Sequence, residues 1–283
     1  MGPLDNYIKD QLNNQIKRIG DDLEHSDIIA IVSPIWPNLD ATVRNAIETS
    51  PEKNSKLAVI LQTQGGVVEV VERIVDVIRN FYNDIAVIVP DQAMSAGTVF
   101  ALSADRILMN YFSRLGPIDP QIIKDGKLVP ALSYLKQYEK LNKRAREGNL
   151  TTAEYAMLGQ LDIGELHQFE QARELSVELL IKWLSTYKFK DWNRTETEKK
   201  KVTGQMKQKR AEEIAKLLNE PERWHSHGRG ISMDTLRNEL QLKIEDFSKH
   251  ERLADNIKKY FDLLMDYLNR HNIQSFVHTE NYF

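Results

Sequence analysis

The chain has no cysteine among its 283 residues. This absence excludes disulfide bonds, thiolate metal ligands and a cysteine nucleophile, and it is compatible with a reducing compartment. Long hydrophobic runs are missing too, because the longest, around residues 57–61 and 85–90, are far shorter than the roughly 20 residues that cross a bilayer. If the protein uses a nucleophile, the attacking atom is therefore an oxygen or a nitrogen.

A strong excess of one charge is also absent, since the net charge is −3. This gives no general basis for binding nucleic acid. The basic run at residues 199–210 has no interleaved aromatic side chain to stack on a base, so we interpret it as a solvated helix face. The first residues lack the basic and apolar parts of a secretory signal. We predict a cytoplasmic protein with no membrane span and no nucleic-acid partner.

Apolar residues recur at spacings of three and four over residues 4–24, which predicts an amphipathic helix. Four short, β-branched segments follow, typical of strands buried on both faces. They span residues 28–32, 57–61, 85–89 and 106–109. The helical period returns at 67–82, between the second and third segments. The order strand, helix, strand predicts parallel pairing with a right-handed crossover.

From Pro130 to about Leu218 the pattern is long, charged and helical. Two further helical stretches are predicted at 233–240 and 253–271, with a short strand between them at 242–244. We therefore divide the chain into an N-terminal helix, an α/β core and a mainly helical region that completes or extends the core. These parts span residues 1–25, 26–128 and 129–283.

Two glycines, Gly65 and Gly66, stand between the second apolar segment and the helix that follows it. Paired glycines allow a sharp turn and a close approach of backbone to ligand, with amide N–H groups facing outward at a helix start. Such a turn can hold an anion or an oxyanion. A strand-to-helix turn also uses glycine for steric reasons alone, so this signal is weak by itself.

A serine occupies the corresponding place after the next strand, in Asp91-Gln92-Ala93-Met94-Ser95-Ala96-Gly97-Thr98. There the hydroxyl of Ser95 would lie near the positive end of a helix, where developing negative charge is stabilised. The alternative is an ordinary N-cap serine. The segment does not match the nucleophile-elbow motif of hydrolases, because Ala93 stands where that motif has its first glycine.

Because the two junctions follow adjacent strands, the N–H groups of Gly66 and Ala96 can converge on one carbonyl oxygen. Farther along, the chain reads Ser113-Arg114-Leu115-Gly116-Pro117-Ile118-Asp119-Pro120-Gln121. This order of motifs resembles the Clp protease and crotonase superfamily, near its signal-peptide-peptidase A group, and more closely the serine dehydrogenase proteinase family. The resemblance implies an α/β fold built as a spiral of βαβ units, with a mainly helical C-terminal region.

The resemblance also implies that Ser95 is the nucleophile and that the backbone of Gly66 and Ala96 forms the oxyanion hole. It implies a homo-oligomer that acts on a peptide or protein substrate without a cofactor. We accordingly predict a serine peptidase-like hydrolase. Two alternatives stay open: a crotonase-like acyl-CoA enzyme, in which the same amides polarise a thioester, and a scaffold that keeps the fold without turnover.

A serine nucleophile needs a base to accept its proton. Where Clp proteases have their histidine, this chain has Ile118. His227, or less favourably His225, lies in a glycine-flanked segment that could form a site loop. Lys136 and Lys140 lie at the chain distance of the lysine base of the signal-peptide-peptidase type. We favour His227 over Lys136, and both stay open.

Three neighbouring features receive structural interpretations. The pair His225 and His227 offers too few ligands for zinc, so we predict no metal site. Asp119 could orient a base, but we favour a turn cap. Arg229 could bind a substrate carboxylate, although an ordinary ion pair is the simpler interpretation.

Overall fold

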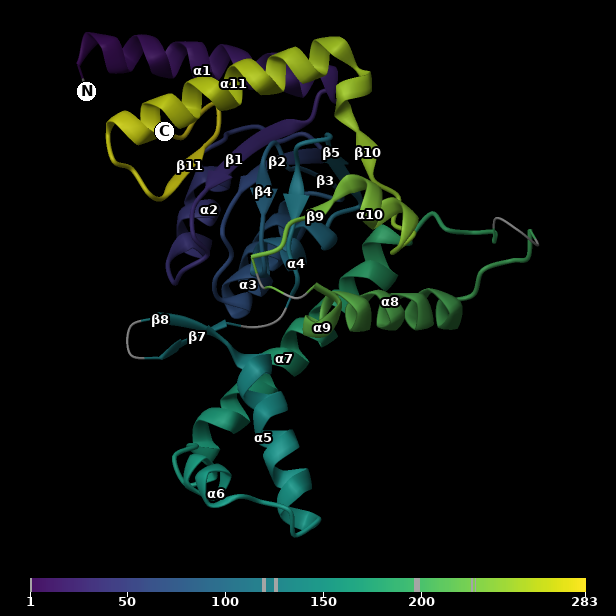
Figure 1. Cartoon of the computed structure of the whole chain (residues 1–283). Coiled ribbons are helices and arrows are strands. Elements are labelled where there is room, and N and C mark those ends of the chain that lie inside the picture. Colours follow the sequence, from purple (N-terminus) through teal and green to yellow (C-terminus); the bar gives the residue numbers. More distant parts are fainter. Residues whose placement is uncertain (1, 119–120, 125–126, 196–198, 225, 227) are drawn as a thin grey trace.

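The computed structural model describes residues 2–118, 121–124, 127–195, 199–224, 226 and 228–283. A six-stranded sheet forms its centre, in the order β10–β5–β3–β2–β1–β11 (Figure 1). The parallel strands are β1 (Asp27–Val32), β2 (Lys56–Gln62), β3 (Asp84–Ile88), β5 (Arg106–Met109) and β10 (Glu245–Asp246). Strand β11 (Phe276–His278) runs antiparallel to β1. The carboxyl ends of the parallel strands therefore meet at one edge, and their amino ends at the other.

Helices cover both faces of this sheet, because successive strand residues point to opposite faces. Ile29 and Ile31 pack against helices that include α2 (Leu39–Glu48), α3 (Val68–Phe81) and α4 (Ala96–Leu102). Ile28 and Ala30 pack against α1 (Pro3–Asp22) and α11 (Glu251–Arg270) on the other face. Figure 1 shows α1 and α11 lying side by side above the sheet. The result is a three-layer arrangement with a separate apolar core on each face.

A helical arm projects from the body (Figure 1). It contains α5 (Ala131–Arg146), α6 (Thr152–Leu158) and the first part of α7 (Ile163–Trp183). A small apolar cluster of Leu135, Leu166 and Phe169 holds α5 against α7. The end of α7 returns to the body, where Trp183 is 1% exposed.

The remaining elements are short or lie close to the body. After α7 come a π-helical turn, η1 (Leu184–Lys188), and the helices α8 (Gly204–Leu218), α9 (Pro221–Trp224), α10 (Met233–Asn238) and η2 (Phe247–Lys249). A second sheet pairs β4 (Gln92–Ala93) with β6 (Arg114–Leu115) and β6 with β9 (Ile231–Ser232). A hairpin joins β7 (Gln121–Lys124) and β8 (Lys127–Pro130).

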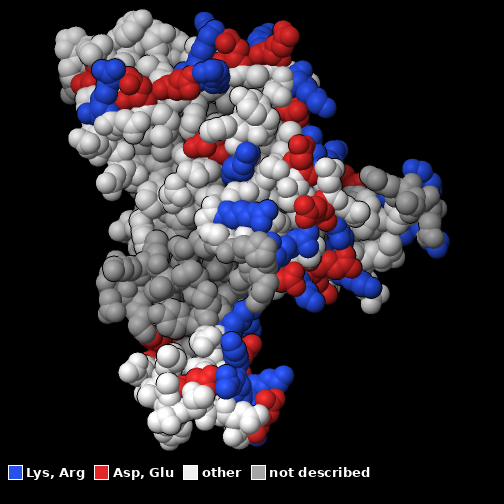
Figure 2. Space-filling view, viewed as in Figure 1, with Lys and Arg blue, Asp and Glu red and all other residues white. Residues whose placement is uncertain are grey.

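Acidic and basic side chains are interspersed on the face of the molecule shown in Figure 2. Within the described ranges, no helix combines the length and the apolar composition needed to cross a membrane.

The α/β class and the main predicted elements are confirmed. The four predicted strands, the helix at 67–82 and the N-terminal helix appear with shifts of one or two residues. The strand predicted at 242–244 is wrong, and the strand lies at Glu245–Asp246 instead. Leu242 and Ile244 are apolar because they enter the core, while their backbone bonds go to α10: Leu242 N–H donates to Leu236, and the Ile244 carbonyl accepts from Arg237.

Sequence reasoning missed α2, the β7–β8 hairpin and β11. The division into three parts stays a prediction. Strands β10 and β11 both come from the region assigned to residues 129–283, and both pair with strands of the predicted core.

Candidate active site

Two turns meet at the carboxyl edge of the main sheet. One follows β2, and the other follows β3 and includes β4. The Thr63 N–H donates to the Gln92 carbonyl at 3.0 Å, and the Met94 N–H donates to the Thr63 carbonyl at 3.0 Å. The Gly-Gly turn and the Ser95 turn are therefore joined by backbone hydrogen bonds, as expected for turns that follow adjacent parallel strands.

Both glycines of the first turn are required by close backbone approach. Gly65 has φ +99°, and a Cβ there would lie 2.7 Å from the Met94 carbonyl oxygen and 2.8 Å from the Cβ of Ser95. Gly66 has φ +148°, and a Cβ there would overlap the Ile35 carbonyl. Gly65 thus brings the turn against Ser95, whereas Gly66 fits it against the turn after β1.

Ser95 has a strained backbone, with φ +52° and ψ −117°. A non-glycine residue in such a region costs about 1–3 kcal/mol, and strain of this kind concentrates at functional sites. The residue is 5% exposed, and its hydroxyl makes no capping hydrogen bond. Ser95 therefore occupies the N-cap position of α4 without capping the helix through its hydroxyl. The turn is sharp and strained, as at a nucleophile elbow, although Ala93 replaces the glycine of that motif.

Two backbone N–H groups beside Ser95 have no hydrogen-bond acceptor among the described residues, namely those of Gly66 and Ala96. The flanking amides are occupied: the Gly65 N–H donates to Thr63 Oγ1 at 3.0 Å, and the Gly97 N–H donates to the Met94 carbonyl at 2.8 Å. The Oγ of Ser95 likewise has no partner within the described ranges. These three groups are left available to a ligand.

A cavity of about 600 Å³ opens beside these groups. This volume lies within the range that holds small ligands. Its wall combines residues of the sheet edge with one face of α7: Trp36, Gly66, Val67, Val68, Glu69, Ser95, Ala96, Val99, Ile118, Glu165, Gln168, Phe169, Gln171, Ala172, Leu175 and Ser176. Among these described lining residues, the ionisable side chains are Glu69 and Glu165. The cavity therefore has room for a small group against Ser95, surrounded by both apolar and polar side chains.

Sequence reasoning missed the α7 face and Trp36 as parts of this cavity. On α7, the lining residues recur every three or four positions from Glu165 to Ser176, which is also the pattern of a helix that packs on a core. Nothing in that periodicity distinguishes a cavity wall from a packing face.

The candidate bases divide into two groups. His225 and His227 lie outside the described residues, as does Asp119. Lys136 is half-buried on α5 and does not line the described part of the cavity. Its neighbour Leu135 packs in the cluster with Phe169, which does line the cavity.

Other predicted candidates lie on the surface. Lys140 and Arg229 are both exposed. In the part of the chain that the structure describes, no group of three or more histidine, aspartate or glutamate side chains is arranged to hold a metal ion.

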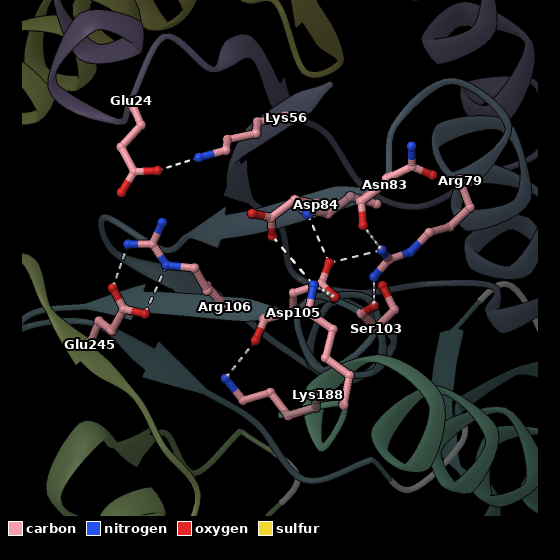
Figure 3. A network of polar contacts seen from close by, with 12 residues as sticks. Glu24, Lys56, Arg79, Asn83, Asp84, Ser103, Asp105, Arg106, Lys188 and Glu245 are labelled. Carbon is pink, nitrogen blue, oxygen red and sulfur yellow. Dashed lines mark hydrogen bonds and ion pairs between the residues drawn. The ribbon is translucent and has the colours of Figure 1, made fainter. Parts of the chain in front are cut away.

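The opposite, amino edge of the sheet holds a cluster of charged groups (Figure 3). The buried carboxylate of Asp105 pairs with Arg79 at 2.8 Å and Lys190 at 2.7 Å, and it accepts the Ile85 N–H at 2.8 Å. Beside it, Glu245 makes two hydrogen bonds to Arg106, which lower the pKa of the Glu245 carboxyl.

Lys188 extends into this cluster from η1 (Figure 3). Burial lowers the pKa of its ammonium to about 8. The cluster lies at the amino ends of β3 and β5, whereas Ser95 follows the carboxyl end of β3, so the length of the strands separates them.

The fold is that of a ClpP-like α/β protein. The chain belongs to the family of ClpP-like SDH-type serine proteinases, whose model matches residues 31–251. This assignment confirms the resemblance and the fold class expected from the motifs.

Two curated relatives come from Methanocaldococcus jannaschii. The uncharacterized protein MJ0137 is 33% identical over 145 residues, which are 47% of this chain and 48% of that protein. The uncharacterized protein MJ1495 is 33% identical over 108 residues, which are 38% of this chain and 35% of that protein. The chain thus spans about half the length of the first relative and less of the second.

Solved structures of two proteases show partial similarity. A mutant of the 1510-N membrane-bound stomatin-specific protease has a TM-score of 0.32 and 19% identity, covering 50% of this chain and 81% of that one. ClpP1 from Listeria monocytogenes has a TM-score of 0.31 and 20% identity, covering 53% of this chain and 91% of that one. The family assignment rests on the family model and not on these partial matches.

Proposed function

We propose that the protein is a serine peptidase-like hydrolase with Ser95 as its nucleophile. One observation carries the proposal: Ser95 is held in a strained turn beside a cavity, with its Oγ and two adjacent N–H groups free of described partners. In this reaction Ser95 Oγ attacks a peptide carbonyl carbon and loses its proton to a base. The C–N bond then breaks, the leaving amine takes the proton, and water hydrolyses the acyl-enzyme.

The N–H groups of Gly66 and Ala96 stabilise the oxyanion in this mechanism. Negative charge develops on the carbonyl oxygen during attack, and fixed donors stabilise that charge without reorganising. One such donor typically contributes about 10²–10³ in rate. The turns after β2 and β3 support this role, because Gly66 and Ala96 both lie at the wall of the same cavity.

We favour His227 as the base and keep Lys136 as the alternative. The path of the described chain supports His227, since β9 begins four residues later and pairs with β6, which pairs with β4 just before Ser95. The packing of α5 on α7 supports Lys136, because Leu135 contacts the cluster that includes the cavity residue Phe169.

Labelling with a fluorophosphonate probe followed by peptide mapping tests the nucleophile. We expect modification at Ser95, and none in Ser95→Ala. The matched control is Ser33→Ala, since Ser33 is also buried and follows β1 at the same edge, but its hydroxyl is bonded to Pro34 and Ser275. That variant should label like the wild type.

Other outcomes of this experiment point to other functions. Labelling at a different residue would remove Ser95 from its role. A folded but unreactive protein would favour the scaffold, and saturable binding of coenzyme A by such a protein would favour the acyl-CoA enzyme.

The pH dependence of labelling separates the two bases. A histidine base must be neutral, so the rate should rise through a midpoint around 6–7, whereas a buried lysine should give a rising limb around 7–9. We expect the lower limb and a loss of about a hundredfold or more in His227→Gln, with Lys136→Met still active. If the labelling rate instead rises only above about pH 8 and the His227→Gln variant stays active, a lysine is the base.

We also propose that the substrate is a peptide or protein and that the chain forms a homo-oligomer. Light scattering at micromolar concentration tests the assembly. A particle of 32.7 kDa, the mass of one chain, would contradict it. The cytoplasmic location remains a prediction.

A further inference from the structure

Part of the serine motif takes no direct part in the proposed chemistry. Gly97 and Thr98 follow Ser95 and Ala96, and Gly116 belongs to the second motif, at residues 113–121, directly after β6. All three are buried against the Ser95 turn, yet none of them lines the cavity. Their contacts suggest a role in holding the nucleophile.

The hydroxyl of Thr98 connects three segments around Ser95. Thr98 is 0% exposed, and its Oγ1 accepts the N–H of Gly116 at 2.8 Å. The same oxygen lies 2.9 Å from the carbonyl oxygens of Ala93 and of Gly116, and its one proton can be donated to either. Thr98, on α4, therefore links that helix to Ala93, which comes just before the Ser95 turn, and to Gly116, which follows β6.

Gly116 reaches Ser95 because of this attachment. A Cβ on Gly116 would lie 3.1 Å from the Ser95 nitrogen and 3.2 Å from the Cα of Met94. Gly65 packs against the other side of the same turn, since a Cβ on Gly65 would lie 2.8 Å from the Cβ of Ser95. The Met94–Ser95 peptide is thus in close contact with two backbone segments. A strained residue persists where its surroundings over-determine it, and these contacts provide that restraint.

We propose that Thr98 is the positioning residue that holds Ser95 in its reactive conformation. Its hydroxyl fixes Gly116 against the Ser95 peptide and fixes Ala93 to the first turn of α4. Thr98 does not touch the substrate cavity, so its effect acts through Ser95. This inference rests on the proposed function of Ser95.

A purely structural threonine is the competing explanation, because threonine hydroxyls in helices often bond to nearby backbone carbonyls. That role would change stability and leave the reactivity of the folded protein intact. The Gly116 N–H distinguishes the two explanations, since it belongs to another segment and contacts the Ser95 peptide through the same glycine.

The test measures fluorophosphonate labelling at saturating probe in Thr98→Val, Thr98→Ala and Thr98→Ser. Valine keeps the shape of threonine and removes the hydroxyl. Serine and alanine differ from each other by the hydroxyl alone, so comparing these two variants still tests the proposal if the valine variant does not fold. The matched control is Ser103→Ala, which removes a buried hydroxyl, bonded to Phe100 at 2.7 Å, from the far end of the same helix.

We expect Thr98→Val and Thr98→Ala to label about 10- to 100-fold more slowly, with unchanged probe affinity and an unchanged pH midpoint. Thr98→Ser and Ser103→Ala should label close to the wild-type rate. Wild-type labelling of a folded Thr98→Val or Thr98→Ala variant would overturn the proposal. So would a Thr98→Ser variant as slow as Thr98→Ala, because packing of the methyl group would then explain the effect.

Hydrogen exchange of residues 93–97 separates this proposal from the proposed function. If the wild type itself is not labelled, the nucleophile assignment fails, but the positioning role still predicts faster exchange in Thr98→Val and Thr98→Ala than in Ser103→Ala. Equal exchange in all three variants would overturn the positioning role.

Discussion

The two edges of the central sheet are organised in opposite ways. At the amino edge, charged side chains are paired: Asp105 is held by Arg79 and Lys190, and Glu245 by Arg106 (Figure 3). At the carboxyl edge, the Ser95 hydroxyl and two backbone N–H groups have no partners among the described residues. Partnerless groups are not confined to the carboxyl edge, because the Nε of Arg79 at the amino edge is buried without a hydrogen-bond acceptor among the described residues. The carboxyl edge differs in that a serine hydroxyl and two backbone amides without partners border the same cavity.

The two edges also differ in the features that border the cavity, although Glu24 at the amino edge combines φ +57° with an ion pair to Lys56. Positive φ values at Gly65, Gly66 and Ser95 occur at the carboxyl edge, beside the cavity. The amino edge carries ion pairs that connect β5 to β10, and the residue before β5 to α3 and to the segment after η1. A variant at one edge should therefore affect reactivity, and a variant at the other should affect stability.

The largest effect is expected from Gly65→Ala at the carboxyl edge. The new Cβ would collide with Met94 and Ser95, so labelling of Ser95 should fall by about 100-fold or more. Gly148→Ala is the matched control, because Gly148 also has positive φ, at +70°, but a Cβ there meets no atom within 4 Å. If Gly148→Ala lost labelling equally, backbone strain in general and not contact with Ser95 would be responsible.

Asp105→Asn tests the amino edge. The substitution removes the charge that faces Arg79 and Lys190, and urea denaturation should show a loss of about 3 kcal/mol in the free energy of unfolding. The folded fraction should still label at Ser95. Asp262→Asn, which breaks an exposed pair with Lys258, should leave the free energy of unfolding without measurable change. A variant that keeps its stability but loses labelling would break the division between the edges.

The smallest effect concerns His278 in β11, a buried polar group whose partners are all present. Its Nε2 lies 2.9 Å from Asn13 Oδ1, and its Nδ1 lies 2.8 Å from the Tyr260 hydroxyl. Burial, with a smaller contribution from Lys9, lowers the pKa of the imidazole to about 3. The neutral ring is therefore the form that the fold accommodates.

For His278 the unfolded chain takes up a proton near pH 6.5 and the folded chain near pH 3, so its contribution is complete above pH 6.5 and declines as the pH falls. Between pH 7 and 5 we expect a loss of about 2 kcal/mol in the free energy of unfolding, measured with urea at each pH. His278→Asn should lack this component of the slope, whereas His25→Gln, at an exposed histidine, should keep it. An unchanged slope in His278→Asn would contradict the assignment.

The sequence predicted much of the carboxyl edge because its signals are local. Each buried strand is a run of apolar, β-branched residues, and consecutive strands joined by a helix pair in parallel. It follows that the turns after β2 and β3 lie together. The proximity of Gly65 and Gly66 to Ser95 could therefore be predicted without knowing any contact between distant parts of the chain.

The amino edge and the cavity wall could not be predicted in the same way. Arg106 meets Glu245 across 139 positions, and α7 reaches the cavity about 70 positions after Ser95. Charged residues at this density are usually solvated, and a helix that lines a cavity has the same period as one that packs on a core. The short strand β11 gave no signal, since its pairing depends on β1.

The sequence by itself determined the α/β class, the buried strands and the two turns that meet beside Ser95, because these follow from local periodicity and from the handedness of parallel crossovers. The tertiary structure decided which hydroxyls and amides lack partners, that Ser95 adopts a strained φ without a capping hydrogen bond, and that α7 lines the cavity. Those properties depend on contacts between segments far apart in the chain, and hydrogen-bond satisfaction and strain exist only once the segments have packed.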